Sequence, residues 1–175
     1  MSEQPWRNPR PAPALAELRQ RVPLTPSWLR AWWPALAWAG VIFILSTDSF
    51  SAANTGSIVE PVLRWLFHSI TNHQIHVIHH LIRKTAHFSE YFIFYLLLFR
   101  GARGTRAGWR WTWAIAALSI AAGYSILDEI HQAFIISRTA SPWDSLIDSI
   151  GAFVAFFAVF LFHRFRSLGD HREIS

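Results

Sequence analysis

Four stretches of mainly apolar residues alternate with polar segments along the chain. Each approaches the roughly 20 residues that a helix needs to cross the hydrocarbon core of a bilayer. Tryptophans stand at the starts of the first and third stretches, where an apolar ring with a polar N–H suits the membrane interface. The pattern predicts an all-α fold, a four-helix transmembrane bundle with spans at about residues 31–47, 81–99, 109–127 and 142–162.

The segment between the first two spans has a helical pattern of its own. Ser57 and Glu60 have the spacing of a capping box, and apolar residues then recur at positions 58, 62, 65 and 66. We predict a short amphipathic helix over residues 57–70 that lies on the outer membrane interface. The alternative is a plain loop helix that covers the bundle.

Basic residues predict the orientation of the spans. The segments before the first span, between the second and third, and after the fourth hold twelve of the sixteen Lys and Arg residues. The positive-inside rule places these three segments, and therefore both termini, in the cytoplasm. We expect residues 1–27 to be a disordered cytoplasmic tail, residues 28–165 to be the membrane domain and residues 166–175 to be a second tail. A signal peptide cleaved after residues 51–53 is the alternative.

Composition narrows the classes of partner. Of the 175 residues, 52% are hydrophobic and only 15% are charged, with a net charge of +5. Arginine in cytoplasmic loops accounts for this basic balance, so we predict membrane lipids and no nucleic acid as partners. The chain has no cysteine, which excludes disulfides and thiolate metal sites.

Ionisable and polar residues gather at the outward ends of three spans. Such groups are costly in a membrane and are generally kept beside partners or water. Asp144 and Asp148 share a helical stripe with Gly151 and Ala155, and the small residues would admit a neighbouring helix. The candidate residues of a polar pocket are Lys84, His87, Glu90, Tyr91, Asp128, Glu129, Gln132, Arg138, Asp144 and Asp148.

These residues have a structural and a functional interpretation. In the structural one, Ser141 caps a helix, Asp144 interacts with the dipole of that helix, and Lys84 and Arg138 neutralise buried carboxylates. In the functional one, Lys84 and Arg138 hold an anionic headgroup in a pocket open to the outer leaflet, beside acid–base groups.

Histidines near these groups raise the question of a metal. His87 with Glu90, and Glu129 with His131, offer ligands of two kinds, but the spacings are ordinary and we expect no metal and no cofactor. A His-rich stretch at residues 73–80 either binds metal adventitiously or titrates near the membrane surface.

The polar motifs resemble a known family. RKTAHFSEY at 83–91, DEIHQAFIISR at 128–138, and the pattern of Asp144, Asp148 and Gly151 resemble the VanZ-like family of bacterial integral membrane proteins. The resemblance covers about residues 35–160. It implies a bacterial cytoplasmic (inner) membrane protein of the cell envelope, in a family whose name comes from a member linked to low-level teicoplanin resistance.

Three functions are compatible with this pattern. The first is an envelope accessory protein whose outward-facing polar pocket binds a lipid-linked cell-wall precursor, an anionic lipid or a glycopeptide. The second is a membrane-embedded hydrolase or transferase that acts on a lipid-linked substrate, although no Gly-x-Ser-x-Gly nucleophile motif is present. The third is a small transporter component, for which four spans are few.

Overall fold

The computed structural model describes residues 27–47, 52–135 and 141–170. The predicted tail of residues 1–27 falls almost entirely outside the described residues, and so does the end of the second tail. Every regular element in the described ranges is an α-helix, as the all-α prediction requires. The helices are α2 (Ser27–Leu45), α3 (Ala52–Leu66), α4 (Asn72–Arg103), α5 (Trp111–Ala133) and α6 (Pro142–Asp170).

Three of these helices are long and apolar enough to cross a membrane: α2, α5 and α6. The fourth predicted span belongs to α4, whose 32 residues make it the longest helix. At 1.5 Å per residue α4 is about 48 Å long, well beyond the ~30 Å of a hydrocarbon core. α4 contains many His, Arg and Lys residues, so its composition is less apolar than that of an ordinary membrane-spanning helix.

The helices differ in length from the predicted spans. α2 begins at Ser27 rather than residue 31, α4 extends the predicted 81–99 in both directions, and α6 continues past residue 162 to Asp170. An apolar run in the sequence identifies only the part of a helix that can contact lipid. Polar residues at either end continue the same helical hydrogen bonding.

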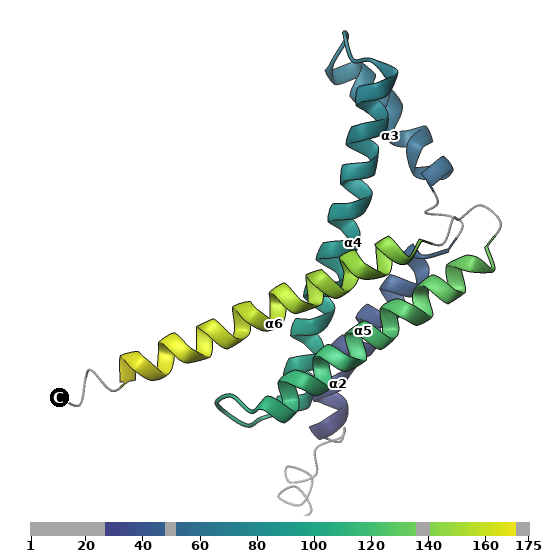
Figure 1. Ribbon diagram of the computed structural model, residues 1–175. Coiled ribbons are helices and arrows are strands. Elements are labelled where there is room, and N and C mark those ends of the chain that lie inside the picture. The colour runs from purple at the N-terminus through teal and green to yellow at the C-terminus, as the bar shows by residue number, and fades with distance from the viewer. Residues whose placement is uncertain (1–26, 48–51, 136–140, 171–175) are drawn as a thin grey trace, which may run out of the picture.

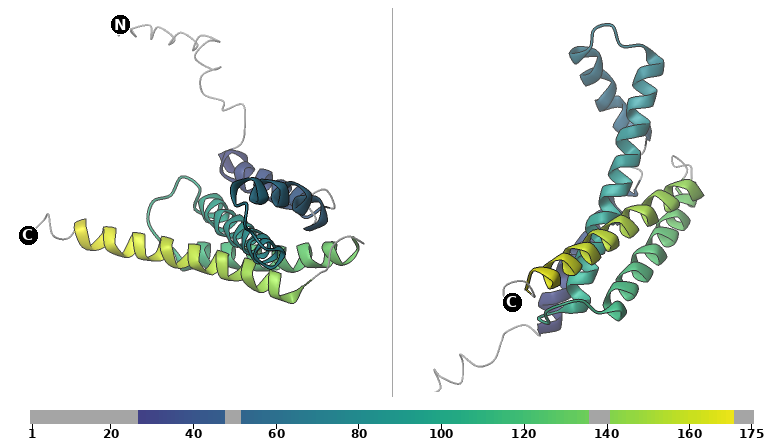
Figure 2. Two further views of the ribbon diagram at one scale, coloured as in Figure 1. Left: turned by 90° about the horizontal axis from the view of Figure 1, so that it is seen from above. Right: turned by 60° about the vertical axis from the view of Figure 1, so that its left-hand side comes forward.

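The long helices alternate in direction, and α4 lies at the centre of the arrangement. Figure 1 shows α2 and α5 running one way and α4 and α6 the other. α4 contacts α2, α3, α5 and α6. Figure 2 shows α6 crossing α4 at a steep angle, so that the C-terminal end of α6 diverges from the other helices. This crossing places the start of α6 beside the middle of α4.

The core forms around one face of α4. Tyr91 and Tyr95 are fully buried there, and Phe94, Leu98 and Phe99 extend the same face. Small side chains on α5 and α6 let these aromatic rings approach: Ala114, Ala117, Ala121, Ala152 and Ala155 are all at most 1% exposed.

Large apolar side chains also cover much of the outside of the helices. An exposed apolar surface of this extent in a soluble protein would promote association, whereas in a bilayer it contacts lipid. The outward-facing side chains include Phe43, Ile115, Ile126, Phe153 and Phe157.

Gly151 marks the point where α6 meets α4. A Cβ added to Gly151 would lie 3.1 Å from the carbonyl carbon of Phe88 and would overlap its carbonyl oxygen. The predicted close approach at the stripe of small residues on α6 is therefore confirmed. Because Asp148 stands one turn before Gly151 and His87 directly precedes Phe88, the same contact brings the two polar groups together.

α3 and the first part of α4 form a hairpin that extends beyond the other helices (Figure 1). The predicted helix over residues 57–70 is shifted, because α3 begins at Ala52 and ends at Leu66. The predicted capping box is wrong: Ser57 lies inside α3, and its hydroxyl donates to the carbonyl oxygen of Asn54 at 2.7 Å. The capping box of this region is instead Thr71 with Gln74, at the start of α4.

Candidate functional site

The middle of α4 supplies the first part of a polar cluster. His87 and Tyr91 lie one turn apart and are buried against α5 and α6, because the apolar residues that follow on the same face anchor it in the core. Glu90 is half-buried, and its carbonyl oxygen accepts a hydrogen bond from Trp38 Nε1 of α2 at 2.9 Å. Lys84 shares the predicted face but is exposed.

The end of α5 supplies the second part. Asp128, Glu129 and Gln132 are buried, Gln132 completely. The Gln132 side-chain amide donates to Asp128 Oδ2 at 3.0 Å, which fixes both side chains on the inner face. Glu129 Oε2 accepts a hydrogen bond of 2.7 Å from the backbone N–H of Ser141, the residue before α6.

The start of α6 supplies the third part. The helix begins at Pro142, directly after Ser141, as the predicted cap requires, and Asp144 lies in its first turn. Asp148 is fully buried one turn deeper.

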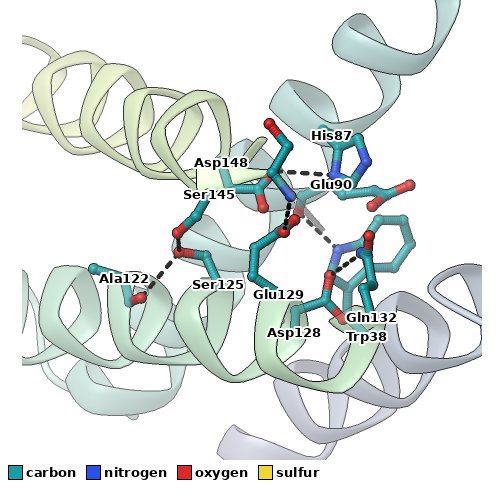
Figure 3. Close-up of polar contacts among 11 residues, drawn as sticks. Trp38, His87, Glu90, Ala122, Ser125, Asp128, Glu129, Gln132, Ser145 and Asp148 are labelled. Atoms are coloured by element: carbon teal, nitrogen blue, oxygen red, sulfur yellow. Dashed lines mark hydrogen bonds and ion pairs between the residues drawn. The ribbon is translucent and has the colours of Figure 1, made fainter. Parts of the chain in front are cut away.

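His87 and Asp148 connect α4 to α6 within this cluster. The distance from Nδ1 of His87 to Oδ1 of Asp148 is 3.2 Å, within the range of an ion pair (Figure 3). Neither atom has the geometry of a hydrogen bond with any described residue. At this distance the imidazole and the carboxylate form an ion pair when His87 is protonated.

Several polar atoms of the cluster are buried without a hydrogen bond. Buried polar atoms in folded proteins almost always have a partner, so a group of exceptions in one place calls for an explanation. Among the described residues, the unpartnered atoms here are Nδ1 of His87, the Tyr91 hydroxyl, Oε1 of Glu129, Oε1 of Gln132 and both carboxylate oxygens of Asp148. We name His87, Glu90, Tyr91, Asp128, Glu129, Gln132 and Asp148 the polar cluster.

The described part of the polar cluster contains carboxylates and a histidine but no Lys or Arg. Among the described residues, no Lys or Arg forms an ion pair with Asp128, Glu129 or Asp148. The expectation that Lys84 neutralises them is wrong, because Lys84 is exposed and forms no ion pair with a described residue. Arg138 lies outside the described residues. The described residues of the cluster therefore suit ligand groups that donate hydrogen bonds more than they suit an anion.

An apolar groove adjoins the polar cluster. It lies between α5 and α6 and has a volume of about 350 Å³. Glu129 stands on its wall, so the groove reaches the cluster. The other lining residues are Ile126, Ile130, Ala133, Ser141, Pro142 and Ser145.

Some residues beside the cluster were not predicted from the sequence. Ser125 and Ser145 join α5 to α6 through a hydroxyl contact of 2.9 Å, and Trp38 joins α2 to α4. Tyr124 donates to the carbonyl oxygen of Ala39 at 2.8 Å. The sequence could have predicted Ser125, because it lies three residues before Asp128 and thus on the same face of α5.

The suggested metal ligands do not converge. The ring of His131 stacks on Phe43 of α2, with centroids 4.7 Å apart. No group of three or more His, Asp or Glu side chains in the described residues has an arrangement that could hold a metal ion.

Comparison with known proteins identifies the family. The family model described as VanZ/LLP1 matches residues 31–163, which include all four long helices except their outermost residues and the whole polar cluster. The searches of curated proteins and of solved structures found no match. Since the family model matches well over half of the chain, this protein belongs to the VanZ/LLP1 family.

Proposed function

We propose that the chain crosses a bacterial inner membrane four times, with α4 as the second span and both termini in the cytoplasm. The polar residues that lower the hydropathy of α4 support this, because His87 and Tyr91 face partner helices rather than lipid. The alternating helix directions also support it. The arginine-rich segment after α4 then lies in the cytoplasm, and the α3–α4 hairpin lies outside.

We further propose that this protein is an envelope accessory protein whose outward-facing pocket, formed by the polar cluster, binds a lipid-linked cell-wall precursor. The observation that carries the proposal is the set of six buried polar atoms, where α4, α5 and α6 converge, that have no hydrogen bond to a described residue. Burying such atoms costs free energy unless a ligand or water pairs with them. All six are acceptors or can act as acceptors.

The charge of the cluster favours one of the three candidate ligands. Carboxylates from α5 and α6 repel the headgroup of an anionic lipid but accept hydrogen bonds from hydroxyl, amide and ammonium groups. The sugar and peptide parts of a lipid-linked precursor offer many such donors. A glycopeptide offers them as well but has no long lipid chain.

The groove between α5 and α6 favours the lipid-linked form. Ile126, Ile130 and Ala133 give it an apolar wall, and Glu129 lies where the wall meets the cluster. A ligand with an apolar chain beside a donor-rich headgroup would occupy both at once. Pockets of this kind, mainly apolar with a few converging polar groups, are the usual form of a small-molecule site.

A membrane-embedded hydrolase or transferase is the second candidate. The approach of His87 to Asp148 favours it, because an imidazole held beside a carboxylate can act as a general base toward water. The described residues offer no nucleophile aligned with His87.

The proposal is tested with the full chain purified in detergent. Thermal unfolding is measured with a lipid-linked disaccharide peptide, with phosphatidylglycerol and with teicoplanin as separate probes. The lipid-linked probe is expected to stabilise the wild type, by about 2.7 kcal/mol at a hundredfold excess over Kd. Asp128→Asn and Asp148→Asn are expected to remove this stabilisation.

Lys84→Gln is the matched control, because Lys84 lies on the same helix but is exposed and outside the cluster. It should keep the wild-type response. An equal response to the probe in Asp148→Asn and in the wild type would refute the pocket. Turnover of the probe that requires His87 would instead establish the enzyme.

A further inference from the structure

A second cavity lies away from the polar cluster, between α3 and the first part of α4. Its volume is about 490 Å³. It occupies the hairpin that extends past the crossing of α4 with α6 (Figure 1). Its polar lining consists of Glu60 and Arg64 from α3 and of Asn72, His76, His79, His80 and Arg83 from α4.

The lining of this α3–α4 cleft is basic. Its acid, Glu60, accepts two hydrogen bonds from Arg64, from Nε at 2.9 Å and from Nη2 at 2.8 Å. Arg64 Nη2 also donates to Asn72 Oδ1 at 2.6 Å, so the guanidinium is held between the two helices. Arg83 forms no ion pair with a described residue. The positive charge of Arg83 is therefore not balanced within the cleft.

His79 lines the cleft, and one of its ring nitrogens makes no hydrogen bond to a described residue. Its Nε2 is buried and has no hydrogen-bond partner among the described residues. Gly56 of α3 stands opposite: a Cβ added there would lie 3.9 Å from this atom. Gly56 therefore approaches His79 without a side chain, and a side chain there would contact the imidazole.

Charge and burial act together on His79. Burial, followed by the charges of Arg83, His80 and His76, lowers the pKa of His79 below its ordinary value. Glu60 and Arg64 face it from α3, but their charges largely cancel. An anion in the cleft would oppose the shift, because it would stabilise the protonated imidazole.

We propose that the α3–α4 cleft is an anion site that binds a phosphate group between Arg83, His79 and Arg64. Arginine presents several N–H donors that match phosphate oxygens, and histidine adds a donor at Nε2. The phosphate comes either from the headgroup of a lipid in the adjacent leaflet or from a free ion. The site is distinct from the polar cluster, and the inference does not depend on the function proposed for that cluster.

Binding is tested by calorimetry with the full chain in an uncharged detergent at constant ionic strength. One arm uses inorganic phosphate at pH 6, and the other uses phosphatidylglycerol in mixed micelles. Phosphatidylglycerol is also compared at pH 5.5 and pH 8, where its own charge does not change. Tighter binding at pH 5.5, with proton uptake, is expected. Binding of the lipid alone would assign the site to a headgroup, and binding of both would assign it to phosphate in general.

Three variants distinguish a specific phosphate site from nonspecific attraction of an anion to positive charge. Arg83→Gln should weaken binding by about tenfold, the effect of one lost charge-assisted hydrogen bond. Gly56→Leu should block the space beside His79 without altering any charge. Lys84→Gln is the matched control, because it removes a neighbouring positive charge that does not line the cleft.

Two results would overturn the proposal. The first is equal loss of binding in Lys84→Gln and Arg83→Gln, which would show that only net charge matters. The second is stabilisation of the protein by Zn²⁺ or Ni²⁺ through the histidines, with no binding of either phosphate probe. That result would make the cleft a metal site.

Discussion

Gly151 of α6 packs directly on the backbone of Phe88 in α4, and a Cβ at this glycine would overlap the Phe88 carbonyl oxygen. The neighbour is a helical backbone atom, which cannot move aside as a flexible side chain can. Glycine is therefore needed here for space and not for backbone freedom. The contact also sets the separation of His87 from Asp148, because each lies within one turn of it.

We predict that Gly151→Ala destabilises the protein by about 1–3 kcal/mol, the usual cost of overpacking a core. The two helices would have to separate, and ligand binding at the polar cluster should weaken with them. Thermal unfolding in detergent measures the first effect.

The control for this variant is Gly123→Ala in α5. A Cβ at Gly123 would meet nothing within 4 Å. Alanine is a better helix former than glycine, so this variant should be as stable as the wild type or more stable by about 0.5–1 kcal/mol. Equal stabilities of the two variants would contradict the close crossing.

The second prediction concerns the pair formed by His87 and Asp148. If the polar cluster serves a ligand, Asp148→Asn should leave the free protein at least as stable as the wild type, because both Asp148 oxygens are buried without hydrogen bonds. If the pair instead holds the bundle together, removing one partner should cost about 3–5 kcal/mol. We expect the first outcome. A double-mutant cycle with His87→Ala measures the coupling directly.

The sequence predicted the helical class and the close stripe on α6. These predictions rest on local rules: apolar run length and small residues at helical spacing. The exposure of Lys84 was not predictable in this way. Lys84 and His87 share a face by helical periodicity, yet only His87 lies at the depth where α6 crosses.

The helix boundaries were less predictable than the helices. Ser57 and Glu60 match a capping box, but Glu60 pairs with Arg64 one turn later, and α3 starts five residues before Ser57. A capping-box sequence does not cap a helix when its residues already lie inside that helix and its acidic residue pairs with another side chain. The α3–α4 cleft was missed for a related reason, since the His-rich stretch and Arg64 come from different helices.

The third prediction tests whether α4 crosses the membrane. The chain has no cysteine, so Ser69→Cys and Thr105→Cys each introduce a single thiol at an exposed position on either side of α4. In intact cells, a membrane-impermeant thiol reagent should modify Ser69→Cys and spare Thr105→Cys. Opened cells should allow modification of both.

Modification of both residues in intact cells would mean that α4 does not span and that the three apolar helices are the only crossings among the described residues. Modification of Thr105→Cys alone would retain four spans but reverse their orientation. The pattern of thiol modification therefore distinguishes these topologies.

The fourth prediction concerns the apolar face of α3. Ile58, Val62, Trp65 and Leu66 are all more than half exposed and share one side of the helix. We expect this side to lie in the membrane interface. A polarity-sensitive dye on Trp65→Cys should shift its emission to the blue in vesicles, and brominated lipid should quench it.

Ser69→Cys provides the reference for that measurement, because it lies in the turn after α3 and should report water. If the dye reports water at both positions, α3 does not contact the membrane, and its apolar face must cover another surface.

The fifth prediction follows from the environment of His79. Because burial and nearby positive charges lower the pKa of His79, the folded hairpin favours the neutral imidazole. The unfolded hairpin binds more protons at acidic pH, so the contribution of His79 to stability is complete above its ordinary pKa and is lost as the pH falls through the lowered value. Without phosphate, amide hydrogens of α3 and of the first part of α4 should exchange faster at pH 5.5 than at pH 7.5, after correction for intrinsic rates.

His79→Gln should reduce this pH dependence, whereas His68→Gln, in the turn outside the cleft, should retain it. A bound phosphate should oppose the effect, because it favours the protonated imidazole that the empty cleft disfavours. Protection at pH 5.5 should therefore recover when phosphatidylglycerol is added. The same protection at both pH values in the wild type would mean that His79 is not coupled to the packing of α3 on α4, even if the cleft binds an anion.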